Sequence, residues 1–187
     1  MLFRSYDLAS ALIKSIRGSH PDAALYYLAR LLEGGEDLSF ISRRLVISAS
    51  EDIGNANPHA LMVATSGASA VAMLGMPEAR IILAQVVTFL ASSPKSNRSY
   101  LAIDQAIAKA RATKDLPVPE HLRNAVTPLM RSLGYGKDYL YAHDDYQKAR
   151  QQEFLPEELK GVVFYEPGDQ GYEKNLKQTL AHLRPEV

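Results

Sequence analysis

The chain has 187 residues, 47% of them hydrophobic and 22% charged, which is enough to fold one domain around a real core. It contains no cysteine, so disulfides, thiolate metal sites and thiol nucleophiles are excluded. The zero net charge hides a basic middle, because residues 79–137 carry nine Lys and Arg against three Asp and Glu, a net of +6 between acidic ends.

Helical periodicity dominates the first third of the chain. Residues 5–17, 21–33 and 37–52 place apolar side chains three and four positions apart, which is the spacing of one face of an α-helix. Gly18 ends the first helix, and Pro21 opens the second at a position where its missing N–H costs nothing. We therefore expect three amphipathic helices before residue 54.

Residues 57–91 are the most apolar part of the chain. Asn57 and Pro58 favour the start of a helix that runs to about residue 74, and Pro77 opens another that runs to about residue 91. The second helix is apolar in every direction, and such a helix must be buried all round. This hairpin is therefore either the centre of one bundle or a surface that meets another subunit. The candidate interface residues are Leu61, Val71, Ile82, Val86, Val87, Phe89 and Leu90.

The chain is less regular after this hairpin. Residues 96–112 and 125–133 are predicted as helices on either side of a rigid Leu-Pro-Val-Pro break at residues 116–119. In the tail, residues 162–165 are expected to form a short strand that pairs with residues 139–141.

The predicted architecture is all-α. A helical oligomerisation bundle spans residues 1–134, and a tail at residues 135–187 belongs to the same domain and ends in a helix at residues 171–183. We expect the tail to wrap over the bundle, because its aromatic side chains need burial.

No catalytic constellation is present in the sequence. The single Gly-Lys pair, at residues 136–137, lacks the remaining glycine and hydroxyl of a phosphate-binding loop, and no strand leads into it. The Glu-Asp pair at residues 51–52 superficially resembles the carboxylates of an ATPase, but its helical context favours a solvated or ion-paired helix end. The His-Asp-Asp run at residues 143–145 favours a structural network with nearby tyrosines over a catalytic base. A small-molecule enzyme is therefore the least supported of the functions considered.

The basic middle offers a different function. Residues 94–98 (PKSNR) lie at a predicted helix start, where N–H groups and cations can together hold a phosphate. The alternative is a solvated rim, or ion pairing with the acidic ends of the same or a neighbouring subunit. A nonspecific DNA-binding module that uses residues 79–137 therefore stays open as an alternative function.

An ordered series of motifs resembles the C-terminal region of the RarA/MgsA family of AAA+ ATPases, which includes the eukaryotic Werner-helicase-interacting protein. The resemblance covers nearly the whole chain. The motifs that carry it lie at residues 6–8, 14–19, 21–26, 49–54, 94–97, 119–124, 133–137, 141–144, 155–158 and 165–167.

The resemblance implies a fold and a role. In that family this region is helical, is similar to the clamp-loader collar, and assembles homotetramers that act at replication forks in DNA replication, recombination and repair. An N-terminal ATPase domain precedes it, so we expect ATP and Mg²⁺ to bind there and this chain to be non-catalytic. The implied partners are a second copy, the N-terminal AAA+ domain, DNA and single-strand-binding protein. Candidate DNA or interface contacts are Lys95, Ser96, Asn97, Arg98, His121, Arg123, Asn124 and Lys137.

The sequence shows no targeting or membrane segment. The first ten residues lack the apolar run of a signal peptide, and residues 81–91 are too short to span a bilayer, which needs about 20 residues. We therefore expect a cytoplasmic, nucleoid-associated protein without a membrane partner.

Overall fold

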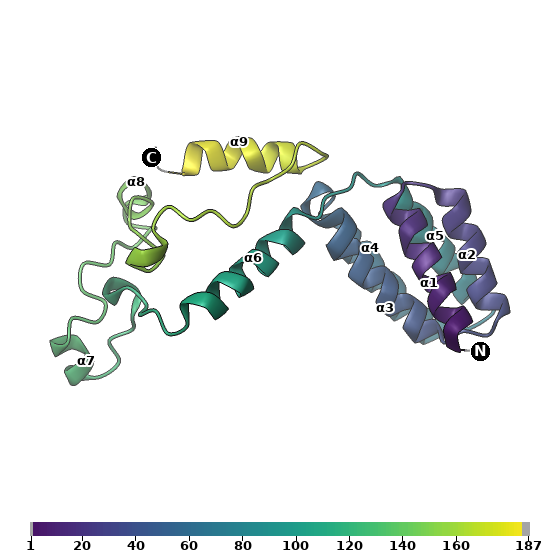
Figure 1. Ribbon diagram of the computed structural model, residues 1–187, viewed down its shortest axis with the longest axis horizontal. Helices are drawn as coiled ribbons and strands as arrows, with labels where there is room; N and C mark the ends of the chain where they lie inside the picture. The colour runs from purple at the N-terminus through teal and green to yellow at the C-terminus, as the bar shows by residue number, and fades with distance from the viewer. Residues whose placement is uncertain (1, 185–187) are drawn as a thin grey trace. The chain divides into compact units, whose positions relative to one another are not determined.

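The computed structural model describes residues 2–184, with side chains from residue 5 onward, and all of its regular elements are helical (Figure 1). The chain divides into two compact units. Unit 1 comprises Met1–Ala102 and Tyr165–Lys177, and unit 2 comprises Ile103–Phe164 and Gln178–Val187. None of the helices in the described part is both long and apolar enough to cross a membrane.

Unit 1 is built around a five-helix bundle. Side-chain caps start two of its helices. His20 precedes the helix that begins at Pro21, and its Nδ1 accepts a hydrogen bond from the Ala23 N–H. Asp37 precedes the next helix and accepts hydrogen bonds from the N–H groups of Ser39 and Phe40. Helix α5 contacts each of the other four. The helices are α1 (Leu2–Arg17), α2 (Pro21–Glu33), α3 (Leu38–Ser48), α4 (His59–Leu74) and α5 (Ala79–Ser92).

The core lies along α5. Leu83, Val87 and Leu90 are buried on it and pack with apolar side chains of α1, α2 and α3. Each large apolar side chain that is removed from water in this way stabilises the fold by about 1.5–3 kcal/mol. The near-complete apolar surface of α5 thus has a physical reason, since four helices cover it.

Helix α4 buries its small side chains and exposes most of its large apolar ones, which is the reverse of a usual amphipathic helix. Its buried positions are the small residues Ala60, Ala64 and Gly67 together with Val71, whereas its larger apolar side chains point outward. Small residues allow the helix axes to approach closely. Part of the apolar surface that the sequence predicted to be buried is therefore exposed on α4.

Gly67 is required at the contact between α4 and α5. A Cβ atom at this position would lie 2.4 Å from Val86 Cγ2, and Val86 is itself buried. We expect Gly67→Ala to lower the free energy of unfolding by about 1–2 kcal/mol in urea titrations, because overpacking outweighs the better helix propensity of alanine. Ser66→Ala, on the exposed side of α4, is the control and should be neutral. Equal stability of the two variants would contradict this packing.

The third helix is shorter than its apolar pattern predicts. It ends at Ser48 and continues as a π-helical turn, Ala49–Ile53, and a 3₁₀ turn, Gly54–Ala56. Gly54 has φ +49°, a left-handed conformation that glycine adopts without strain. This irregular segment carries the Ser-Glu-Asp-Ile-Gly motif and places its polar side chains at one end of the bundle.

Unit 2 contains short helices joined by irregular segments. Helix α6 (Arg98–Thr113) begins in unit 1 and ends in unit 2, and α9 (Glu173–Leu183) does the same. The elements between them are a 3₁₀ turn Glu120–Leu122, α7 (Pro128–Ser132), α8 (Tyr146–Ala149) and a 3₁₀ turn Glu157–Leu159.

The predicted β element of the tail does not form. Among residues 2–184 no strand is present, so residues 162–165 do not pair with residues 139–141. The Leu140 N–H and C=O groups are instead bonded by the Gln152 side-chain amide, and the Val162 N–H donates to the Leu159 carbonyl in a turn. Because these backbone groups are already satisfied locally, no ladder is needed. The described all-helical fold otherwise agrees with the predicted class.

Candidate interaction surfaces

A buried carboxylate organises one end of unit 1. Glu173, at the start of α9, is 0% exposed and accepts three hydrogen bonds. The donors are the Ser96 hydroxyl (2.7 Å), the Gly168 N–H (2.7 Å) and the Tyr165 hydroxyl (3.1 Å). We call these four residues the Glu173 cluster. It joins the Pro-Lys-Ser-Asn motif to the segment that begins at Tyr165.

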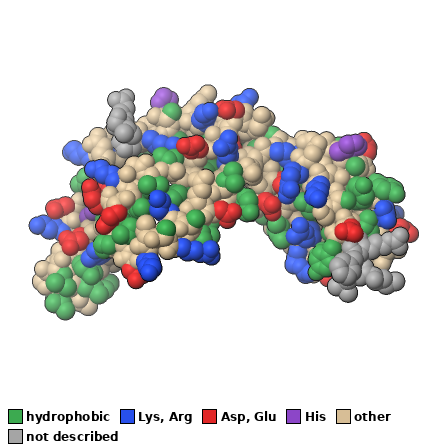
Figure 2. Space-filling model, in the orientation of Figure 1, with side chains coloured by type: hydrophobic (Ala, Val, Ile, Leu, Met, Phe, Trp, Pro, Cys, Tyr) green, Lys and Arg blue, Asp and Glu red, His purple; other side chains and the backbone are tan. Residues whose placement is uncertain are grey.

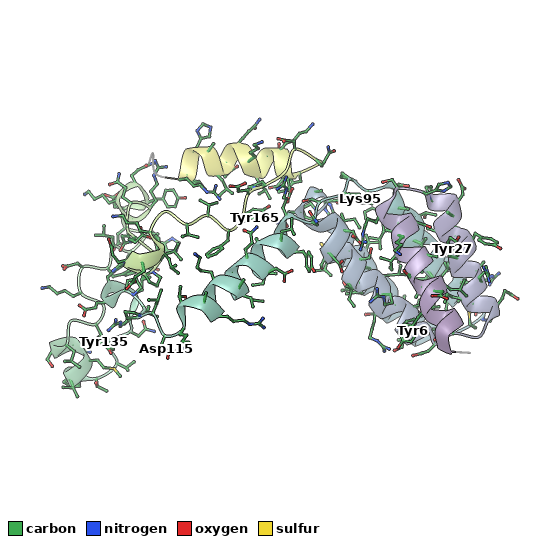
Figure 3. All side chains as sticks on the ribbon, in the orientation of Figure 1. Tyr6, Tyr27, Lys95, Asp115, Tyr135 and Tyr165 are labelled. Carbon is green, nitrogen blue, oxygen red and sulfur yellow. The ribbon has the colours of Figure 1, made fainter. Side chains whose placement is uncertain are left out.

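Further contacts fix that segment in place. Asn55 Nδ2 donates to the Tyr165 hydroxyl and to Ser99 Oγ, both at 3.2 Å, and Tyr165 lies beside the beginning of α6 in Figure 3. Burial raises the pKa of Tyr165, and the nearby Glu173 carboxylate acts in the same direction while the Asn55 hydrogen bond opposes it. Gly171 has φ +54°, and a Cβ there would lie 2.1 Å from the Ala56 carbonyl oxygen. Such close approach leaves no room for another residue type.

A second group of charges lies next to this cluster. Arg17 Nε contacts Asp52 Oδ1 at 2.5 Å, and the Ser48 hydroxyl donates to Asp52 Oδ2 at 2.8 Å. Arg17 also pairs with Glu51 at 3.3 Å. The hydrogen bond to Asp52 raises the pKa of Arg17 further above its already high value. The Glu51-Asp52 pair is therefore an ion-paired helix end, which is one of the two alternatives that the sequence favoured over a catalytic pair.

Two of the four predicted DNA or interface contacts in this region, Lys95 and Ser96, are held by side-chain contacts within the protein. The Lys95 ammonium donates to the Ala91 carbonyl (2.9 Å), the Ser93 carbonyl and the Ser19 hydroxyl (3.1 Å), and so caps the end of α5. Burial lowers the pKa of Lys95, although Asp52 acts in the opposite direction. Ser96 belongs to the Glu173 cluster, while Asn97 and Arg98 are exposed. Lys95 and Ser96 thus have defined structural partners.

The remaining predicted contacts lie in unit 2. His121 Nε2 lies 2.8 Å from the Glu153 carbonyl oxygen, and Arg123 Nε donates to the Val118 carbonyl at 2.6 Å. The Arg123 guanidinium also lies 5.1 Å from the centre of the Tyr135 ring. Asn124 and Lys137 are exposed. His121 and Arg123 therefore join segments of unit 2, whereas the other two face solvent.

The predicted interface residues divide into two groups. Val71, Val86, Val87 and Leu90 are at most 3% exposed and belong to the core of unit 1. Leu61 is 44% exposed, and Ile82 and Phe89 are partly buried at the edge of the core. Several exposed apolar side chains were not singled out from the sequence, because their outward direction depends on how the helices pack. They are Ile47, Met62, Met73, Leu74, Met76 and Ile81.

An apolar groove runs between α3 and α4 on this surface. It has a volume of about 650 Å³, and Val46, Ile47 and Ala72 contribute to its wall. Ser42 also lines the groove, and its buried hydroxyl has no hydrogen-bond partner in the described part of the chain. Figure 2 shows hydrophobic side chains that reach the surface of this bundle. An unfilled apolar groove with an unsatisfied hydroxyl is typical of a surface that a partner completes.

Residues considered for chemistry are not enclosed in a site. His143, Tyr141 and Asp144 are all exposed, and Asp145 caps α8 by accepting the Lys148 N–H at 3.1 Å. The described residues contain no group of His, Asp or Glu arranged to hold a metal ion.

The regular elements of the described chain are all helical, and Glu173, Asp52 and Lys95 each join segments of unit 1 through hydrogen bonds or ion pairs. The chain belongs to the family described as MgsA AAA+ ATPase C terminal, which matches residues 18–184. This result confirms the family that the sequence motifs predicted.

Curated relatives agree with the family. The chain is 48% identical over 180 residues to "Replication-associated recombination protein A" of Coxiella burnetii, with 96% of this chain and 41% of that protein covered. It is 44% identical over 181 residues to the protein of that name in Escherichia coli K12, with 96% and 40% covered. It is 43% identical over 166 residues to "ATPase WRNIP1" of Dictyostelium discoideum, with 86% and 18% covered. The chain thus spans about two fifths or less of each of these relatives.

Proposed function

We propose that this domain is the homo-oligomerisation collar of an AAA+ ATPase that acts in DNA replication and recombination. The domain itself is non-catalytic in this proposal, and ATP and Mg²⁺ bind in an N-terminal AAA+ domain outside this chain. The names of the relatives support the replication role. DNA and single-strand-binding protein are further proposed partners, in keeping with a cytoplasmic, nucleoid-associated location.

The exposed apolar surface of α3 and α4 is the observation that carries the proposal. Met73 is 77% exposed, Met62 62%, and Ile47, beside the groove, 46%. Scattered single apolar residues are normal on a protein surface, but a 650 Å³ groove with the exposed Ile47 in its wall is a feature of protein interfaces. A second copy of the chain would fill the groove with the same kind of side chains. Homotetramers are the assembly that we propose.

A charge placed on this surface should separate the subunits without unfolding them. We expect the unmodified chain to be a tetramer by light scattering at micromolar concentration. Ile47→Glu should raise the dissociation constant about a hundredfold, because an interface would bury its unpaired carboxylate. Circular dichroism should remain unchanged, since Ile47 already faces solvent.

The matched control is Val126→Glu, which places the same charge at a 75%-exposed apolar residue of unit 2. It should remain tetrameric. If the unmodified chain were monomeric at micromolar concentration, the proposal would be ruled out. If both variants dissociated equally, the groove would not be the subunit interface. DNA contact through residues 79–137 stays the alternative function.

A further inference from the structure

A second pocket of unit 1 lies between α1 and α3, on residues different from those of the apolar groove. It has a volume of about 250 Å³. Its floor is apolar and its rim is aromatic and cationic. The described residues that line it are Tyr6, Ala9, Ser10, Ile13, Lys14, Arg17, Phe40 and Arg44.

Helix α1 supplies one wall of this pocket. Tyr6, Ser10 and Lys14 are four residues apart, so they lie on one face at intervals of about 6 Å along the axis. Side chains on a helix lean toward its N-terminus, which brings the long Lys14 side chain toward the ring of Tyr6. Tyr6 lies near the beginning of α1 (Figure 3). An aromatic ring, a hydroxyl and an ammonium group therefore follow one another along this wall.

Helix α3 supplies the opposite wall. Phe40 and Arg44 are also four residues apart, and the Phe40 ring packs edge-on against Tyr6, with ring centroids 6.2 Å apart and planes at 80°. Ala9 and Ile13 are buried beneath them. The pocket thus combines an aromatic end with a cationic end over an apolar floor.

Two of the three cations in the pocket are free to bind an anion. Arg17 is already paired with Asp52 and Glu51. The side chains of Lys14 and Arg44 have no hydrogen-bond or ion-pair partner among the described residues, and none of the described lining residues is acidic. Two uncompensated cations at one end of a pocket create a local positive potential that attracts an anion.

We propose that this pocket binds a nucleotide, with the phosphate between Lys14 and Arg44 and the base against Tyr6. The planar guanidinium of Arg44 matches the geometry of phosphate oxygens, and Lys14 adds a mobile positive charge. Aromatic side chains beside basic ones are the arrangement by which proteins hold single-stranded nucleic acid without sequence preference. The site does not depend on the proposed oligomer surface.

The exposure of Tyr6 favours a base over an apolar peptide side chain. Tyr6 is 63% exposed. A peptide side chain gains from enclosure on all sides, whereas a base gains from stacking on an exposed ring. An acidic peptide that also carries aromatic residues is the competing ligand, and the experiment below separates the two.

Fluorescence anisotropy with labelled oligo(dT) at low salt tests the site. We expect the unmodified chain to bind, and Lys14→Gln/Arg44→Gln to weaken binding about tenfold. The slope of log affinity against log salt should become shallower by about 0.7, the value for one lost phosphate contact on a single strand. Tyr6→Leu should weaken binding about fivefold or more without changing that slope. Competition with dTMP identifies the form of the ligand. If dTMP displaces the labelled oligo(dT), the pocket binds a free nucleotide. If only unlabelled oligo(dT) displaces it, the pocket binds a strand.

The matched control is Lys160→Gln/Lys174→Gln, which removes two exposed charges elsewhere and should leave affinity within about twofold. Circular dichroism confirms that each variant is folded. Three results would overturn the proposal. The first is that the unmodified chain does not bind oligo(dT) at low salt. The second is that only Lys109→Gln/Arg111→Gln, in the basic segment, lowers the affinity. The third is that a peptide containing Asp and Phe displaces the label, whereas neither dTMP nor unlabelled oligo(dT) does.

Discussion

Val87→Glu is expected to unfold the α1–α5 bundle. Val87 is 0% exposed and belongs to the apolar core, so a carboxylate there would have neither water nor a polar partner. We expect the free energy of unfolding to fall by more than about 4 kcal/mol. Because small domains are stable by only about 5–15 kcal/mol, this loss should move the urea transition to a much lower urea concentration or abolish it.

Ile81→Glu is the control for this substitution. It introduces the same charge on the same helix, at a side chain that is 61% exposed, and should change stability by no more than about 0.5 kcal/mol. The comparison separates the two interpretations of the hairpin. If Val87→Glu remained folded and only dissociated the oligomer, Val87 would belong to an interface and not to the centre of the bundle.

Glu173→Ala is expected to release the segment that begins at Tyr165. The substitution leaves three donors, the Ser96 and Tyr165 hydroxyls and the Gly168 N–H, without their acceptor in a buried place. Unsatisfied buried donors cost about 1–3 kcal/mol each, and partial access of water reduces the sum, so we expect a loss of about 3–5 kcal/mol. Urea titration measures the loss, and faster hydrogen exchange at the Gly168 amide locates it.

Two further variants test that the carboxylate is responsible. Glu173→Gln keeps the shape and one acceptor oxygen, and should lose about half as much stability as Glu173→Ala. Glu158→Ala, at an exposed carboxylate of unit 2, should have an effect of no more than about 0.5 kcal/mol. Unchanged stability and exchange in Glu173→Ala would mean that the Glu173 cluster does not hold this segment.

Local signals were sufficient to place most of the helices. Helix α2 begins at Pro21 as predicted, and α4 ends at Leu74 before Gly75, because caps and breakers act within one turn of the backbone they control. The family also followed from the sequence, since short motifs are readable without coordinates. The π-helical turn at Ala49–Ile53 was missed, because the apolar spacing of α3 continues through it.

The candidate sites could not be predicted from local sequence signals, because their residues lie far apart in the chain. Ser96 was singled out from a motif, but its partner Glu173 lies 77 positions later and carries no local signal of burial. Likewise, no local signal places Phe40 and Arg44 opposite Tyr6 and Lys14, because the two pairs lie on different helices that only the tertiary structure brings together.

The positions of the helices and the family of the chain could be predicted from residues that are close in the sequence. This is because the hydrogen bonds of an α-helix join residues four positions apart and each motif is contiguous. The orientation of α4 is different, since apolar residues occur on most sides of that helix and periodicity cannot choose a buried face. Packing against α5 decides it, because Gly67 admits Val86 at close range and turns Met62 and Met73 to the surface. The apolar residues 57–91 are thereby divided into a core on α5 and an exposed surface on α4.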